Sequence, residues 1–252
     1  MKRAIVYTLI FAGIQMLGGG LVDLAYLLIK GDGINIGATG LIIATAMTGV
    51  ATIIVFLATK WTVVSRHWVQ TRPWFVLFWC VMAALGLLIP STWLQEQMPE
   101  LPNIAEQTFD LIMKDRLGYF IVGLLAPLAE ELVFRGAVLK SLLQWKQNPW
   151  VGIVISAILF ALIHMNPAQM PHAFLVGLLL GWMYWRTDSI VPGVVYHWVN
   201  NSVAYIIYNI YPDPSLTLLD MFGSQQKILM ALVFSLCVFL PALYQLNLRL
   251  KK

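Results

Sequence analysis

The chain has 252 residues, of which 60% are hydrophobic and 11% charged, and its mean hydropathy is +0.77. Soluble domains carry about 25% charged residues, so the composition excludes an ordinary soluble protein and predicts an integral membrane protein. The net charge of +4 comes without a soluble basic patch. It therefore gives no support for nucleic-acid binding and fits contact with the anionic headgroups of a lipid bilayer.

Apolar segments long enough to cross about 30 Å of hydrocarbon as helices follow one another along the chain. We expect eight spans, at roughly 4–29, 41–59, 74–90, 117–139, 149–166, 172–186, 189–211 and 226–246. The runs are continuous and do not alternate, which favours helices over a barrel, because backbone polar groups in lipid must be satisfied internally. The predicted fold is an all-α, polytopic membrane helix bundle of about eight transmembrane helices, with residues 1–252 forming a single membrane domain.

The distribution of lysine and arginine predicts the orientation, because these residues concentrate on the cytoplasmic side. With the N-terminus inside, four of the 16 fall outside, namely Lys30, Lys114, Arg116 and Lys227. The other 12 fall inside, namely Lys2, Arg3, Lys60, Arg66, Arg72, Arg135, Lys140, Lys146, Arg186, Arg249, Lys251 and Lys252. Both termini are therefore expected in the cytoplasm and the loop 91–116 outside.

The fourth span contains Glu130, Glu131 and Arg135 within an otherwise apolar run. A charged side chain at the centre of a bilayer costs at least about 2.5–3.5 kcal/mol, so such a group needs partners or a water-filled cavity. Glu131 and Arg135 are four residues apart with the acid first, the favourable order for a helical ion pair. Glu130 projects about 100° away and is expected to be free and to face a cavity. The alternative is an ion pair at a helix end that only holds the bundle together.

Two later spans carry polar residues as well. Phe160 precedes His164 by four residues at the end of the fifth span, and His197 precedes Asn201 by four residues in the seventh. His197 and Asn201 are expected on one helix face, with Asn200 turned away. Polar side chains in a span are expensive to leave unpaired, and interhelical hydrogen bonding alone is the alternative explanation for each group.

Together, Glu-Glu-x-x-x-Arg, Phe-x-x-x-His and His-x-x-x-Asn, in this order on three spans, resemble the CPBP family of intramembrane proteases. That family contains the CAAX prenyl endopeptidases and the bacteriocin-processing or self-immunity proteins. The resemblance covers about 115–210, the expected catalytic core, and includes His164-x-Asn166-x-x-Gln169, which resembles the bacterial members. The resemblance therefore implies a bacterial plasma membrane. The other spans carry no matching motif.

The resemblance implies a peptidase that cleaves a peptide or protein substrate in or beside the membrane. Glu130 and His164 would activate water, His197 and Asn201 would stabilise the oxyanion, and Glu131 with Arg135 would support the site. Members are described both as glutamate-type enzymes and as metalloproteases. We favour no metal; if Zn²⁺ is bound, the ligands would be Glu130, His164 and His197. The substrate, the cofactor and the oligomeric state remain unknown at this point.

Two other functions stay open. Buried acids and histidines also build the ion pathways of transporters and channels, although transporters often show matched halves with paired broken helices. A non-catalytic immunity or scaffold protein on the same fold is the second alternative, and it is mildly disfavoured because every position of the family's catalytic pattern is occupied.

Further expectations concern packing and depth. Gly18-Gly19-Gly20 predicts a close helix crossing with Asp23 bonded to a neighbour, and Gly177-x-x-x-Gly181 predicts packing inside the monomer.

His172 is a weaker candidate for a third metal ligand, and His67 is expected to be solvated. Counted at about 1.5 Å per residue, Glu130 and His164 would differ by about 10 Å in depth within a ~30 Å core, unless tilt or a break near Pro127 brings them together.

Overall fold

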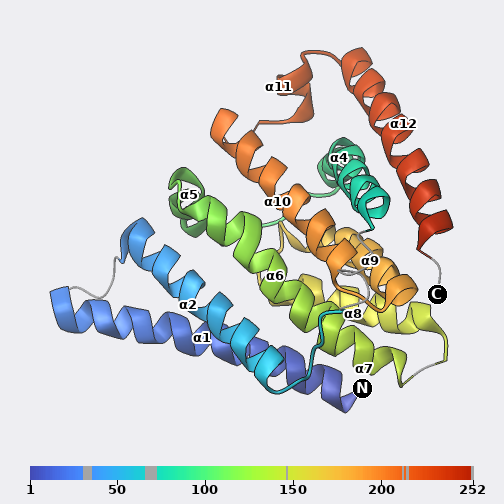
Figure 1. Cartoon of the computed structure of the whole chain (residues 1–252). Coiled ribbons are helices and arrows are strands. Elements are labelled where there is room, and N and C mark those ends of the chain that lie inside the picture. Colours follow the sequence, from blue (N-terminus) through green and yellow to red (C-terminus); the bar gives the residue numbers. More distant parts are fainter. Residues whose placement is uncertain (31–35, 66–72, 146, 212, 214–215, 251–252) are drawn as a thin grey trace.

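The computed structural model describes residues 1–30, 36–65, 73–145, 147–211, 213 and 216–250, and within these ranges it is helical without a strand (Figure 1). The all-α prediction is confirmed. Seven residues on which predictions were based lie outside the described ranges or have no described side chain: Lys30, Arg66, His67, Arg72, Lys146, Lys251 and Lys252.

The helices follow the expected spans closely. In chain order they are α1 (Lys2–Lys30), α2 (Gly37–Ala58), α4 (Trp74–Glu96), α5 (Glu106–Lys114), η1 (Phe120–Leu125), α6 (Ala126–Glu131), η2 (Leu132–Leu139), α7 (Lys140–Leu143), α8 (Pro149–Ile163), α9 (Met170–Thr187), α10 (Val191–Ile210), α11 (Leu218–Phe222) and α12 (Gln225–Arg249). The segments η1 and η2 are π-helical.

Among the described residues, four helices are long and apolar enough to cross a membrane: Lys2–Ile29, Gly37–Ala58, Trp74–Glu96 and Gln225–Arg249. The helix α8 is apolar but has only 15 residues. The chain is thus an integral membrane protein, and the number of eight spans stays a prediction. The expected span 117–139 is divided into η1, α6 and η2, because the hydrogen bonding widens on either side of α6. Such widened turns occur often at functional sites.

The helices α8 and α9 pack through small residues. A Cβ on Gly177 would lie 3.0 Å from the Cβ of Ala157, and one on Gly181 would lie 3.0 Å from Cγ2 of Ile153. Close backbone approach of this kind drives helix association in lipid. The packing of the Gly177 and Gly181 face inside the monomer is confirmed.

The helices α1 and α2 cross where a Cβ on Gly18 would lie 2.2 Å from Cγ2 of Thr48. The close crossing is confirmed, although Gly19 and Gly20 face open space. The expectation for Asp23 was wrong, because its side chain is exposed and bonds to no neighbour among the described residues. Asp23 follows Gly18 by five residues, so it projects about 140° around α1 from the glycine that faces α2.

The segment η1–α6–η2 occupies the middle of the molecule. In Figure 1, the α1–α2 pair lies on one side of it and α9 and α10 on the other. Every residue of η2 is buried, and its Phe134 contacts Phe11 of α1 and Phe160 of α8. This central position lets Glu130, Glu131 and Arg135 meet side chains from several other helices.

Candidate active site

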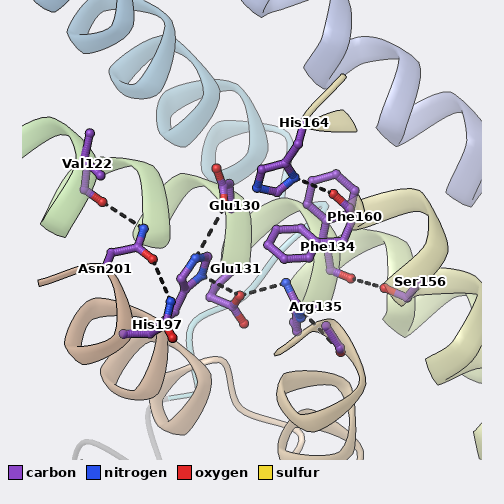
Figure 2. A network of polar contacts seen from close by, with 12 residues as sticks. Val122, Glu130, Glu131, Phe134, Arg135, Ser156, Phe160, His164, His197 and Asn201 are labelled. Atoms are coloured by element: carbon purple, nitrogen blue, oxygen red, sulfur yellow. Dashed lines mark hydrogen bonds and ion pairs between the residues drawn. The ribbon is translucent and has the colours of Figure 1, made fainter. Parts of the chain in front are cut away.

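Glu131 and Arg135 form the expected ion pair deep in the protein. Arg135 Nη1 donates to Glu131 Oε1 at 2.8 Å, and the two side chains are 1% and 0% exposed. Arg135 Nη2 donates to the carbonyl oxygen of Gly177 at 3.3 Å, and the guanidinium lies 4.4 Å from the ring centroid of Phe160. The pair therefore ties the fourth expected span to α9 and α8 (Figure 2).

The second oxygen of Glu131 faces a glycine. Oε2 of Glu131 is buried and has no hydrogen-bond partner within the described ranges, and a Cβ on Gly193 would lie 2.5 Å from it. Any larger residue at position 193 would displace the carboxylate. Sequence reasoning missed Gly193, because a glycine in the first turn of a helix is common and gives no specific signal.

His197 lies between the two glutamates, as Figure 2 shows. Its Nδ1 is 3.2 Å from Glu131 Oε1, and its Nε2 is 3.6 Å from Glu130 Oε2. A carboxylate paired with arginine can only accept, so Nδ1 of His197 carries a hydrogen and donates it. The sequence predicted that Glu130 is free. Its carboxylate instead faces the His197 ring, which Glu131 holds in place.

Glu130 also lines a cavity of about 270 Å³ with His164. The side chain of Glu130 is 19% exposed, in contrast to fully buried Glu131. The expected 10 Å difference in depth is therefore not present. The helix α6 starts directly before Pro127, and α8 ends at Ile163, which brings both side chains to the same cavity.

The protonation of the His164 ring follows from its partner. Nδ1 of His164 is 2.8 Å from the carbonyl oxygen of Phe160, and the two rings meet edge-on with centroids 5.0 Å apart. Because a carbonyl only accepts, Nδ1 must donate, and in the neutral ring Nε2 is an acceptor. His164 thus offers a lone pair beside the carboxylate of Glu130.

Asn201 is bound on both sides. Its Nδ2 donates to the carbonyl oxygen of Val122 at 3.0 Å, and its Oδ1 accepts from Asn200 Nδ2 at 3.2 Å. The helix face shared with His197 is as expected, but Asn200 does not turn away, because its amide reaches sideways to Asn201. One amide hydrogen of Asn201 remains for another acceptor.

The side chains, as placed, do not fit a zinc site. Zinc in proteins takes three or four ligands at about 2.0–2.3 Å. Within the described part of the chain, no group of three histidine, cysteine, aspartate or glutamate side chains is close enough together to hold a metal ion. This finding covers Glu130, His164 and His197, and also His172.

Asn166, noted in the sequence only as part of a pattern, fixes the loop after α8. It is 1% exposed; its Oδ1 accepts from the backbone of Ile104 at 3.1 Å, and its Nδ2 donates to Asn103 at 2.8 Å. The preceding residue, Met165, has a left-handed backbone with φ of 49°. The turn that begins at His164 is thereby held against the chain segment before α5.

Comparison with known proteins identifies the region that carries these residues. Residues 113–203 match the family model described as type II CAAX prenyl endopeptidase Rce1-like. The UPF0177 protein YxdF of Lactococcus lactis subsp. lactis (strain IL1403) is 29% identical over 127 residues, an alignment that covers 47% of this chain and 65% of that protein. The match thus spans less than two-thirds of the length of this relative. No solved structure matches. The resemblance predicted from the three motifs is confirmed.

Proposed function

We propose that this integral membrane protein, whose residues 113–203 are of the Rce1-like CAAX endopeptidase type, hydrolyses a peptide bond with water activated by Glu130 and His164. The family match supports an intramembrane peptidase in general. The observation that carries the finer proposal is that Glu130 and His164 line one cavity while Glu131 is buried against Arg135.

Glu130 and His164 suit a water molecule bound between them. The carboxylate of Glu130 and Nε2 of His164 are both acceptors, so each can take one hydrogen of the water and turn its lone pair toward a scissile carbonyl. As the carbon–oxygen bond forms, the proton passes to Glu130. Glu130 then returns it to the leaving nitrogen as the carbon–nitrogen bond breaks.

His197 and Asn201 are proposed to stabilise the oxyanion. The bond from His197 Nδ1 to Glu131 fixes the ring so that Nε2 faces the side of Glu130. In its imidazolium form, with a hydrogen on each ring nitrogen, His197 can donate from Nε2 to the developing negative charge, and the unused amide hydrogen of Asn201 is one helical turn away. Donors preorganised in this way lower the barrier because they need no reorientation during the reaction.

The alternatives make different demands on Glu130. A transporter or channel would use it as an ion or proton site, and an immunity or scaffold protein would not need its charge. A metalloprotease would need zinc. Stoichiometric zinc in the purified active protein, lost in the His164→Ala variant, would support that mechanism over the one proposed.

A comparison of membrane-proteome peptides tests the function and identifies the substrate. The gene is deleted and restored as wild type, as Glu130→Gln or as Met16→Leu, a control on the exposed face of α1. We expect cleaved bonds that appear with wild type and with the control but not with Glu130→Gln. Identical peptide sets from wild type and Glu130→Gln would contradict the proposal. A quenched-fluorescent peptide spanning such a bond is the probe peptide used below.

The same probe peptide tests the assigned roles. His164→Ala should abolish cleavage, and Asn201→Ala should lower the rate by about 10²–10³-fold, as for removal of one oxyanion donor.

A further inference from the structure

Part of the wall of the catalytic cavity comes from outside the family-matched region. Besides Glu130 and His164, the cavity is lined by two residues of α1 and two of α2, with three apolar residues completing the wall: Phe11 and Gln15, Thr45 and Gly49, and Ala126, Ala129 and Ile163. In Figure 2 the blue ribbons of α1 and α2 run on the same side of the site as Glu130 and His164. The N-terminal helix pair therefore borders the space that a substrate must occupy.

Gln15 is an unusual residue for its place. It lies about 20 Å along α1 from Lys2, at 1.5 Å per residue, near the middle of a 28-residue candidate span. Few residues of this span are buried inside the protein, so α1 faces mainly lipid. A polar side chain at this depth normally has a partner. Yet the amide of Gln15 makes no hydrogen bond within the described ranges, and its side chain is only partly buried.

The other polar group on this wall is already engaged. Thr45 Oγ1 donates to the carbonyl oxygen of Leu41 at 2.8 Å. Gln15 thus supplies an uncommitted amide to the cavity that the acceptors of Glu130 and His164 also line. Phe11, one helical turn before it, contacts Phe134 and closes the wall with an apolar ring.

We infer that Gln15 is a substrate-binding residue whose side-chain amide pairs with the main chain of the peptide held in the cavity. A glutamine amide has a donor and an acceptor side by side, as a peptide unit does. An extended substrate segment leaves both its N–H and its C=O unpaired, and at membrane depth these groups need a partner from the protein or from bound water. This inference rests on the proposed peptidase function and adds that α1 takes part in substrate binding.

The test uses Gln15→Met, which keeps the length of the side chain and removes both polar groups. The matched control is Met16→Leu, the neighbouring residue, which is 71% exposed on the lipid-facing side. With the probe peptide, Gln15→Met should raise KM about 10-fold, the loss expected for one to two neutral hydrogen bonds, with kcat within about two-fold. Its thermal midpoint should not fall, because no internal bond is lost. Met16→Leu should change none of these values.

A second measurement locates the contact on the substrate. Single amides of the probe peptide are replaced by esters, which remove one N–H donor each. At the position that Gln15 contacts, the ester should lower kcat/KM for wild type about 10-fold relative to the amide peptide. For Gln15→Met, the ester and amide peptides should give the same kcat/KM. An unchanged KM of Gln15→Met, with wild type active and Glu130→Gln inactive, would overturn the role of Gln15 and leave the peptidase proposal intact. A fall in thermal midpoint with an unchanged KM would assign Gln15 a structural role. If wild type cleaved the probe peptide no faster than Glu130→Gln, the peptidase proposal itself would be overturned.

Discussion

Glu130 and Glu131 are neighbours in the sequence with opposite surroundings. Glu131 is fully buried, with Arg135 at 2.8 Å and His197 at 3.2 Å on the same oxygen. Glu130 is partly exposed to a cavity. The i, i+4 spacing was enough to predict which acid pairs with Arg135. The contact of His197 with both acids was not predictable, because it depends on how α10 is placed against α6.

Replacement of Glu131 should affect stability first. Glu131→Gln leaves Arg135 buried without a counter-charge, and breaking such a pair by removing one partner costs about 3–5 kcal/mol. We therefore expect a large fall in the thermal midpoint, measured in detergent, while Glu130→Gln keeps the wild-type midpoint. Equal midpoints for the two variants would show that the buried ion pair does not hold these helices together.

At the scale of elements, the sequence predicted the spans well and the turns poorly. Hydropathy defines where a helix enters and leaves lipid, and the expected boundaries lie within a few residues of most helices. It contains nothing about hydrogen-bond register, so the π-helical turns on both sides of α6 were not expected. Counting residues also contains nothing about the tilt of a helix, so it could not show that Glu130 and His164 line the same cavity.

The short helix α5 is attached to α10 through Asp110. Lys114 donates to Asp110 at 2.7 Å, and Tyr208 of α10 donates to its other oxygen. The hydrogen bond from Lys114, and then that from Tyr208, hold the pKa of Asp110 below its ordinary value of 3.8. A lowered pKa means that the stability contributed by ionised Asp110 is complete above the ordinary value and is lost as the pH falls through the lowered one.

Hydrogen exchange of the amides in Glu106–Lys114 measures this attachment. At about pH 7 these amides should exchange faster in Asp110→Asn than in wild type, because the amide cannot pair with Lys114 as an ion. The difference should disappear in strongly acidic buffer, where Asp110 of the wild type is protonated. A constant difference across the pH range would rule out the ionised Asp110 as its source.

For the whole molecule, the positive charges predict how the bundle lies in the membrane. In Figure 1 both chain ends and α7 lie toward one side, and α5 and α11 toward the opposite one. This arrangement agrees with cytoplasmic termini and an external loop 91–116, predicted from the 12 to 4 division of lysine and arginine. The orientation itself stays a prediction.

Single-cysteine labelling of intact cells checks the orientation. In a background without Cys80 and Cys237, the native cysteines, a cysteine in the loop 91–116 should react with an impermeant reagent, and cysteines near 66 and 146 should react only after lysis. External labelling near 66 or 146 would invert the topology.

Glu130 and Glu131 have different proposed roles, the first in catalysis and the second in the buried ion pair with Arg135. The most direct measurement is cleavage of the probe peptide by purified wild type and Glu130→Gln in liposomes, with thermal stability recorded on the same preparations. We predict that Glu130→Gln lowers kcat by at least about 10²-fold, the scale of general base catalysis, without a change in stability, because the amide keeps the shape of the side chain but cannot take a proton from water. Near wild-type turnover by a well-folded Glu130→Gln protein would contradict the account.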